Sequence, residues 1–355
     1  MSVSTLPRIT PKSQLQPILL QGHERSITQV KFNQDGDLLF TTAKDNKPTV
    51  WYADTGERIG TYDHHKGALW DIDPSWDSEY VVTACADGSA RLFETTTGRY
   101  IAKMPHKGAA RAVSWGDGSH HFAKASDPFT SRENGNISIY KFPADESSLL
   151  KVKGEDAPIL PPELEIPVDG LNKAICLGWT AANQHILAGF DSGMIAKYDV
   201  NTGQEVQRKQ LHSARVNRLN FNSDKTLFIT ASVDTTALVV DPETLDIVKT
   251  FKTDRPVNGA VISPLHPHVL LGGGQDAMHV TVTAASAGKF ETRFFHLVYG
   301  EEFGRVKGHF GPINAIAMHP SGKSYASGAE DVFIRLHHFD QSYIYTSDLI
   351  PEDLK

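Results

Sequence analysis

The chain has 355 residues, 40% hydrophobic and 22% charged, which is typical of a globular protein rather than a disordered one. Its net charge of −7 disfavours non-specific nucleic-acid binding, which needs a basic surface. The two cysteines, Cys85 and Cys176, are too few for a disulfide framework or a cysteine-based zinc site. We see no apolar run long enough to span a membrane and no signal peptide, and so expect a cytoplasmic protein.

The first strongly patterned region begins at His23 and predicts a set of short strands. Residues 27–32, 38–43, 50–52 and 58–62 alternate with polar turns, as in consecutive hairpins. The pattern starts again at His65, 42 residues after His23. A repeat of about 40–45 residues with a Gly-His start and an aromatic finish is typical of the four-stranded blades of WD40 β-propellers.

The clearest marker of this repeat is a histidine followed 22 residues later by an aspartate. We expect each histidine to precede the first strand of a blade, and each aspartate to lie in the turn between the second and third strands. The pairs are His23 and Asp45, His65 and Asp87, His212 and Asp234, and His309 and Asp331.

Seven blades would use roughly 300 residues, so the sequence predicts an all-β, seven-bladed WD40 β-propeller. In the sixth blade, Asp276 is expected in the turn before the third strand. After the first blade, the expected strands are 68–72, 80–84 and 90–93; 110–115, 122–125 and 137–140; 175–179, 186–189 and 195–198; 216–221, 227–231 and 237–240; 257–262, 269–272 and 280–283; and 313–317, 325–328 and 334–337.

Three segments interrupt the repeat, and loops of this length are usually functional or disordered. Residues 142–172, rich in proline and acidic side chains, are expected to link the third and fourth blades in an extended form. Residues 284–306 are expected to lengthen the sixth blade by a longer hairpin. Residues 341–355 are expected to form an acidic tail beyond a propeller domain of residues 1–340.

The segment before the first blade, residues 15–21 (LQPILLQ), has no local strand to pair with. The last blade, which ends at His337, is one strand short. We therefore expect the N-terminal segment to supply the outer strand of the seventh blade. This closure would leave no long free sheet edge in the ring.

The His–Asp pairs look like catalytic dyads, because an aspartate orients the histidine of a catalytic triad. Four copies of one pair are better explained as a polar network within each repeating unit, since buried polar groups need hydrogen-bond partners. In the first blade, Trp51 and Thr42 are expected to complete that network. No catalytic, cofactor-binding or metal-binding residue is therefore predicted.

The repeat is filled unevenly, and some blades depart from the pattern at single positions. Val282 takes the place of Trp51 in the sixth blade. Val332 takes the place of a turn glycine in the seventh blade. Because a β-branched residue is strained at positive φ, we expect the turn at Val332 to differ from the others.

Several stretches are more specific than the general repeat. They include Gly-Gly-Gly-Gln at 272–275 and Ser-Tyr-Ala-Ser-Gly at 324–328, which the propeller fold does not require. With the surrounding residues 22–45, 270–296 and 304–340, they resemble the WD40 subunit i family of eukaryotic translation initiation factor 3. The resemblance covers essentially the whole ring.

The resemblance implies a non-catalytic scaffold in the factor that helps to load initiator tRNA and mRNA on the small ribosomal subunit. It implies contacts with a C-terminal segment of subunit b and with subunit g, and with the ribosome through the complex. The main subunit b contact in the family is on the fifth and sixth blades. On this chain that contact points to Arg218, Asp234, Thr235, Asp241 and Asp254.

Other classes of function remain open. A signalling adaptor for a receptor kinase is the main alternative, in which Tyr343 or Tyr345 of the tail would be modified. An enzyme is disfavoured because the chain offers no unrepeated polar constellation. A direct RNA binder is disfavoured by the net negative charge.

Overall fold

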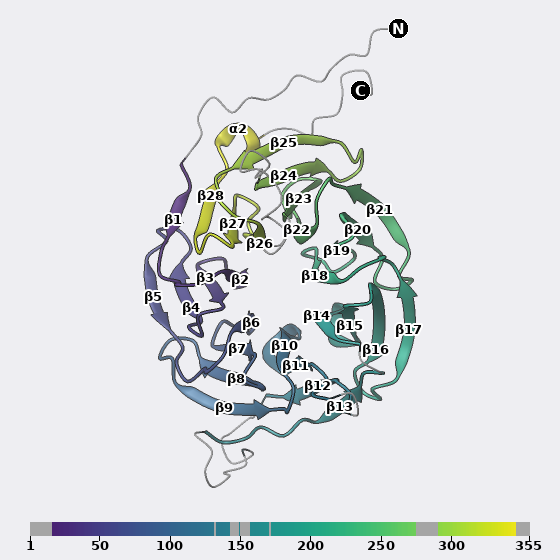
Figure 1. The fold of residues 1–355 in the computed structure, drawn as a ribbon. Coiled ribbons are helices and arrows are strands. Elements are labelled where there is room, and N and C mark those ends of the chain that lie inside the picture. Colours follow the sequence, from purple (N-terminus) through teal and green to yellow (C-terminus); the bar gives the residue numbers. More distant parts are fainter. Residues whose placement is uncertain are drawn as a thin grey trace.

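A computed structural model describes residues 16–130, 133–142, 149, 157–169, 172–274 and 290–345. Within these residues the strands form seven sheets of four antiparallel strands each. The sheets are arranged radially around an axis, with the first strand of each blade innermost (Figure 1). The prediction of a seven-bladed β-propeller is confirmed.

The first four blades follow one another along the chain. Their strands are β2 (Ile27–Phe32), β3 (Leu38–Ala43), β4 (Thr49–Tyr52) and β5 (Arg58–Thr61); β6 (Leu69–Pro74), β7 (Tyr80–Cys85), β8 (Ser89–Glu94) and β9 (Tyr100–Pro105); β10 (Ala110–Trp115), β11 (His121–Ser126), β12 (Asn136–Lys141) and β13 (Leu164–Pro167); and β14 (Ala174–Trp179), β15 (His185–Phe190), β16 (Met194–Asp199) and β17 (Glu205–Gln210).

The last three blades complete the ring, and short helices lie outside the sheets. The strands are β18 (Val216–Phe221), β19 (Phe228–Ser232), β20 (Thr236–Val240) and β21 (Ile247–Lys252); β22 (Val257–Ile262), β23 (His268–Gly273), β24 (Glu291–His296) and β25 (Glu302–Lys307); and β26 (Ile313–Met318), β27 (Ser324–Ala329), β28 (Ile334–His338) and β1 (Ile18–Leu20). The helices are η1 (Asp117–Ser119), η3 (Ala181–Asn183) and α2 (Gln341–Ile344).

The hydrophobic core is divided among the interfaces between blades. Each of its seven clusters draws buried side chains from two consecutive blades. The last cluster joins the seventh blade to the first, with Ala326 and Leu336 packed in one group with Leu39 and Trp51. A blade therefore buries its two faces only against its neighbours in the ring.

Polar side chains near the axis add a second tie between blades. Asp71 of the second blade accepts from Gln29 Nε2 of the first at 2.8 Å and from the Val113 amide of the third at 3.1 Å. These residues are 42 positions apart, so the hydrogen bonds join equivalent positions of the first three blades. A different position connects the two ends of the ring, where Asn314 donates to the Ile27 carbonyl at 2.9 Å.

The N-terminal segment closes the ring, as the sequence predicts. Strand β1 pairs antiparallel with β28, with Ile18 opposite Leu336 and Leu20 opposite Ile334. Leu20 is 1% exposed and belongs to the cluster between the seventh and first blades. The first residues of the described chain and its last blade are thus joined by a sheet ladder.

The expectation of an extended link at 142–172 is wrong for its C-terminal part. Residues 164–167 form β13, which pairs with β12 as the outer strand of the third blade. Before it, the Leu160 amide donates to the Lys103 carbonyl on β9 at 3.0 Å, and Leu160 is buried. Part of this proline-rich segment therefore belongs to the blades, with residues 164–167 as a strand and Leu160 as a buried side chain. Residues 143–148, 150–156, 170 and 171 lie outside the described residues.

The third strand of the sixth blade is also displaced from its expected place. Residues 275–289, with Asp276 and the expected strand 280–283, lie outside the described residues. Strand β24 pairs with β23 instead, with Phe295 opposite Val269. The insertion therefore precedes the third strand, and Phe295 holds the position assigned to Val282.

The turn at Val332 keeps the conformation of the other turns, so the expected difference is wrong. Val332 has φ +65°, close to the +65° of Asn46 and the +72° of Thr235 in the same turn of other blades. Asp331 holds the chain here, because its carboxylate accepts from the Phe310 amide at 2.9 Å and the Phe333 amide at 3.3 Å. These bonds offset the strain of a β-branched residue at positive φ.

We predict that deletion of residues 1–21 lowers the midpoint of thermal unfolding, because the β1–β28 ladder and the buried Leu20 are lost together. Deletion of residues 1–15 removes no residue of β1 and is the matched control. Thermal unfolding of the full chain and both truncated chains checks this. Equal midpoints for all three would contradict closure by β1.

Candidate partner-binding surfaces

Three of the four His–Asp pairs are in direct hydrogen-bond contact. In each pair the histidine Nδ1 faces the carboxylate of the aspartate, which lies in the turn between the second and third strands. The shortest Nδ1–oxygen distances are 2.8 Å for His23 and Asp45, 2.9 Å for His212 and Asp234, and 3.1 Å for His309 and Asp331.

The same aspartates also bind the backbone beside the histidine. The amide of the residue after each histidine donates to the carboxylate, at 3.0 Å from Glu24 to Asp45 and at 3.0 Å from Ser213 to Asp234. The pair thus fastens the loop that enters a blade to the turn inside it. A carboxylate used in this way in every copy is a structural element, which agrees with its repetition.

On its other side each histidine contacts a buried hydroxyl of the second strand. In the first blade His23 Nε2 lies 2.8 Å from Thr41 Oγ1, and Trp51 Nε1 donates to the same oxygen at 2.8 Å. The expected residue, Thr42, is wrong by one position, and its hydroxyl lies 2.9 Å from that of Thr28. Adjacent strand residues point to opposite faces of a sheet, so only one of the two threonines can reach His23.

The second blade departs from the pattern, since no direct bond joins His65 to Asp87. Arg91 Nη1 lies between them, 2.6 Å from His65 Nδ1 and 2.7 Å from Asp87 Oδ2. Burial and the neighbouring Arg91 charge lower the pKa of His65 to about 3, so the ring is neutral. Despite burial, hydrogen bonds from Ser89 and Arg91 lower the pKa of Asp87 to about 2.

This altered network bears on metal binding. His65, Cys85 and Asp87 place one ligand atom each within 4.8 Å of one another. However, a positive Arg91 guanidinium contacts both His65 and Asp87. Burial also raises the pKa of Cys85 to about 11, whereas metals bind the thiolate. The three residues therefore do not suit a cation.

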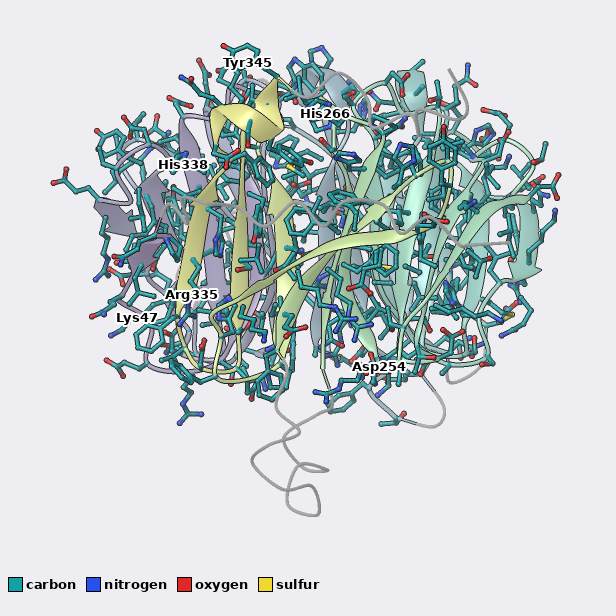
Figure 2. All side chains as sticks on the ribbon, turned by 90° about the horizontal axis from the view of Figure 1, so that it is seen from above. Lys47, Asp254, His266, Arg335, His338 and Tyr345 are labelled. Carbon is teal, nitrogen blue, oxygen red and sulfur yellow. The ribbon has the colours of Figure 1, made fainter. Side chains whose placement is uncertain are left out.

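The five predicted partner-binding residues do not form a single patch. Asp234 and Thr235 precede β20 and Asp241 follows it, so they lie at opposite ends of the strand, roughly 20 Å apart at about 3.3 Å per residue. Figure 2 shows the two faces of the ring: Lys47, Asp254 and Arg335 lie towards one, and His266, His338 and Tyr345 towards the other. Asp234 and Thr235 lie on the same face as Asp254, because the Thr253 amide donates to the Thr235 carbonyl at 2.9 Å.

Among these residues Asp254 is the most available to a partner. Its side chain is 65% exposed and forms an ion pair with Arg293 of β24. The Asp234 side chain is 9% exposed and is held by His212 and Thr236. Arg218 lies on the innermost strand β18, where Nη2 donates to the Thr28 carbonyl at 2.6 Å. Arg218 therefore faces the axis of the ring rather than its rim.

An apolar surface that sequence reasoning missed lies on the outer strands β17 and β21 of the fourth and fifth blades and on the β24–β25 turn of the sixth. We name it the outer-wall patch, and its exposed fractions are 53% for Val206, 47% for Ile247, 58% for Val248, 64% for Val298 and 40% for Tyr299. Lys249 Nζ donates to the Val298 carbonyl at 2.6 Å and joins two of these blades. The adjacent apolar residues Ile247 and Val248 were the available signal in the sequence, because neighbours on a strand point to opposite faces and a half-buried strand covers only one of them.

The start of the tail packs against the sixth and seventh blades. Tyr343 of α2 stacks on Phe339 with ring centroids 4.2 Å apart, and its hydroxyl lies 2.8 Å from His268 Nδ1. Tyr345 is 79% exposed. Of the two tyrosines considered for modification, Tyr345 is therefore the accessible one.

The closed ring of four-stranded blades and the repeated His–hydroxyl–Asp networks define the WD40 class of β-propeller. No described helix is long and apolar enough to cross a membrane. The family model described as EIF3I matches residues 15–347.

Similarity to known proteins identifies the family within this class. The proteins named eukaryotic translation initiation factor 3 subunit I from Drosophila sechellia and Drosophila melanogaster are each 46% identical to this chain over 332 residues, covering 93% of this chain and 98% of each relative. The protein of that name from Drosophila willistoni is 46% identical over 326 residues, or 92% of this chain and 98% of its own. The chain belongs to the subunit I family of eukaryotic translation initiation factor 3, which confirms the resemblance seen in the sequence.

We predict that Thr41→Val lowers the free energy of unfolding by about 2 kcal/mol or more, because the buried His23 and Trp51 nitrogens both lose their partner. Thr42→Val, the matched control, removes one bond between two hydroxyls and is expected to cost about 1 kcal/mol. Urea unfolding of both variants measures the difference. A larger loss for Thr42→Val would contradict the network.

Proposed function

We propose that this chain is a non-catalytic scaffold subunit of eukaryotic translation initiation factor 3. In this role it binds subunits b and g and supports preinitiation complex assembly, mRNA recruitment and scanning. The observation that carries the proposal is the 46% identity with subunit I relatives across 98% of their length. The matched region thus spans the whole ring.

The use of the polar residues supports a scaffold rather than an enzyme. The histidines and aspartates that could serve as acid–base groups hold loops and turns in repeated copies. Their carboxylates accept backbone amides, as a structural group does. The rim and the outer wall are the surfaces that remain open to a protein partner.

The subunit b contact is proposed along β21, between the fifth and sixth blades. The outer-wall patch supplies apolar anchor sites at the start of β21, with exposed Glu243 and Asp246 beside them. Asp254 lies past the other end of the strand and is also exposed. A basic and apolar segment suits this combination, because apolar anchors give affinity and charges give orientation.

The length of β21 fits one such segment. Its six residues span roughly 20 Å at about 3.3 Å per residue. A helix of about 13 residues covers the same distance at about 1.5 Å per residue. One helix can therefore contact the outer-wall patch near Asp241 and the rim at Asp254. A helix bound along β21 would thus contact both Asp241 and Asp254, although these two predicted residues do not lie in one patch.

We predict that Ile247→Asp/Val248→Asp and Asp254→Lys each reduce recovery of subunit b in a pull-down from cell extract. The first change places charge in the apolar patch, and the second reverses the rim charge. Ile59→Asp is the matched control, since Ile59 is 42% exposed on the outer strand of the first blade. Circular dichroism establishes that each variant is folded.

The possible results distinguish the scaffold function from the location of the subunit b contact. Recovery of initiation-factor subunits by wild type and Ile59→Asp, with loss in the other variants, supports both. Equal recovery by every variant would keep the scaffold function and reject the β21 site. Recovery of no initiation-factor subunit by the wild type would reject the scaffold function.

A further inference from the structure

A cavity of about 540 Å³ lies at the axis of the ring. We name it the axial cavity; it is lined from the inner strands and the loops around them, on the side of the His–Asp turns. Five cationic side chains line it: Lys44, Arg111, Lys173, Arg215 and Arg218. This concentration of positive charge contrasts with the net charge of −7 of the whole chain.

Acidic groups balance only part of this charge. Asp191 and Glu330 are the acidic residues of the lining. Glu330 pairs with Lys44 at 3.5 Å and also accepts from Asn314 at 2.8 Å. Arg111 pairs with Asp127. Within the described part of the chain, Lys173, Arg215 and Arg218 form no ion pair.

Two nitrogens of the lining residues remain without a hydrogen-bond partner among the described residues. Arg218 reaches across the axis to the Thr28 carbonyl at 2.6 Å, but its Nε is buried and unpaired. Trp70 Nε1 is also buried and unpaired, while the Arg111 guanidinium lies 4.4 Å over the Trp70 ring. Both nitrogens are enclosed by protein atoms, so they mark the wall of the cavity as polar and are not themselves contact points for a ligand.

We propose that the axial cavity binds a small soluble molecule that carries several phosphate groups. Guanidinium groups match phosphate oxygens in charge and geometry, and three cations that form no ion pair favour a multivalent anion over a single carboxylate. The cavity volume falls in the range of about 300–1,000 Å³ that holds small ligands. A long nucleic acid is disfavoured because the chain outside the cavity is acidic overall.

This site is independent of the proposed scaffold function, because it uses the axis rather than the outer wall. Isothermal titration calorimetry with inositol hexakisphosphate as the probe tests it on the full chain. We expect binding by the wild type that weakens as salt is raised, since the attraction is electrostatic. Lys173→Gln/Arg215→Gln is expected to bind roughly tenfold or more weakly, because two charged donors are lost.

Lys252→Gln is the matched control, since Lys252 is an exposed cation at the end of the outer strand β21 and does not line the cavity. It is expected to bind the probe like the wild type. Arg218 is left intact because it joins inner strands across the axis.

Several results would overturn the proposal. One is the absence of probe binding by the folded wild type, and another is an equal loss of affinity in the control and cavity variants. Vesicles containing phosphatidylinositol bisphosphate and a short single-stranded RNA form two further arms. Binding to either without binding of the free probe would place the phosphate source on a membrane or a nucleic acid and reject a small soluble ligand.

Discussion

The structure depends on one constraint, which is that each blade buries its faces only against the blade before it and the blade after it. Each of the seven hydrophobic clusters is shared by two consecutive blades. An open ring would expose two of these faces at once. The strand β1 has only three residues, but its pairing with β28 holds the seventh blade against the first and so keeps the ring closed.

The same constraint determines which surfaces are free for function. Blades diverge with distance from the axis, so neighbours no longer cover the outermost strands. Strand β21 shows the result, with Ile247 and Val248 both exposed although they are adjacent. At the axis the blades converge instead of diverging. The inner strands and the loops before them therefore place Lys173, Arg215 and Arg218 around a common space. The proposed protein contact and the proposed anion site both follow from this radial geometry.

The blades were predictable because the His–Asp spacing reports a repeated local structure, and the closure was predictable because the last blade, read to His337, is one strand short. What failed depends on features that the repeat does not encode. The insertion in the sixth blade moved the third strand to β24, since a spacing pattern cannot tell on which side of a strand extra residues fall. Arg91 replaced a direct contact between His65 and Asp87 with a bridge. The outer-wall patch arises from three blades that only the folded ring brings together.

The most direct test of the scaffold account is crosslinking of the assembled initiation factor with a lysine-reactive reagent, followed by mass spectrometry. Lys209, Lys249 and Lys252 lie on the outer strands β17 and β21. Lys47 and Lys66 are exposed on the first and second blades and serve as internal controls. The account predicts that crosslinks to subunit b concentrate on the first set. Crosslinks concentrated on Lys47 and Lys66 would contradict it.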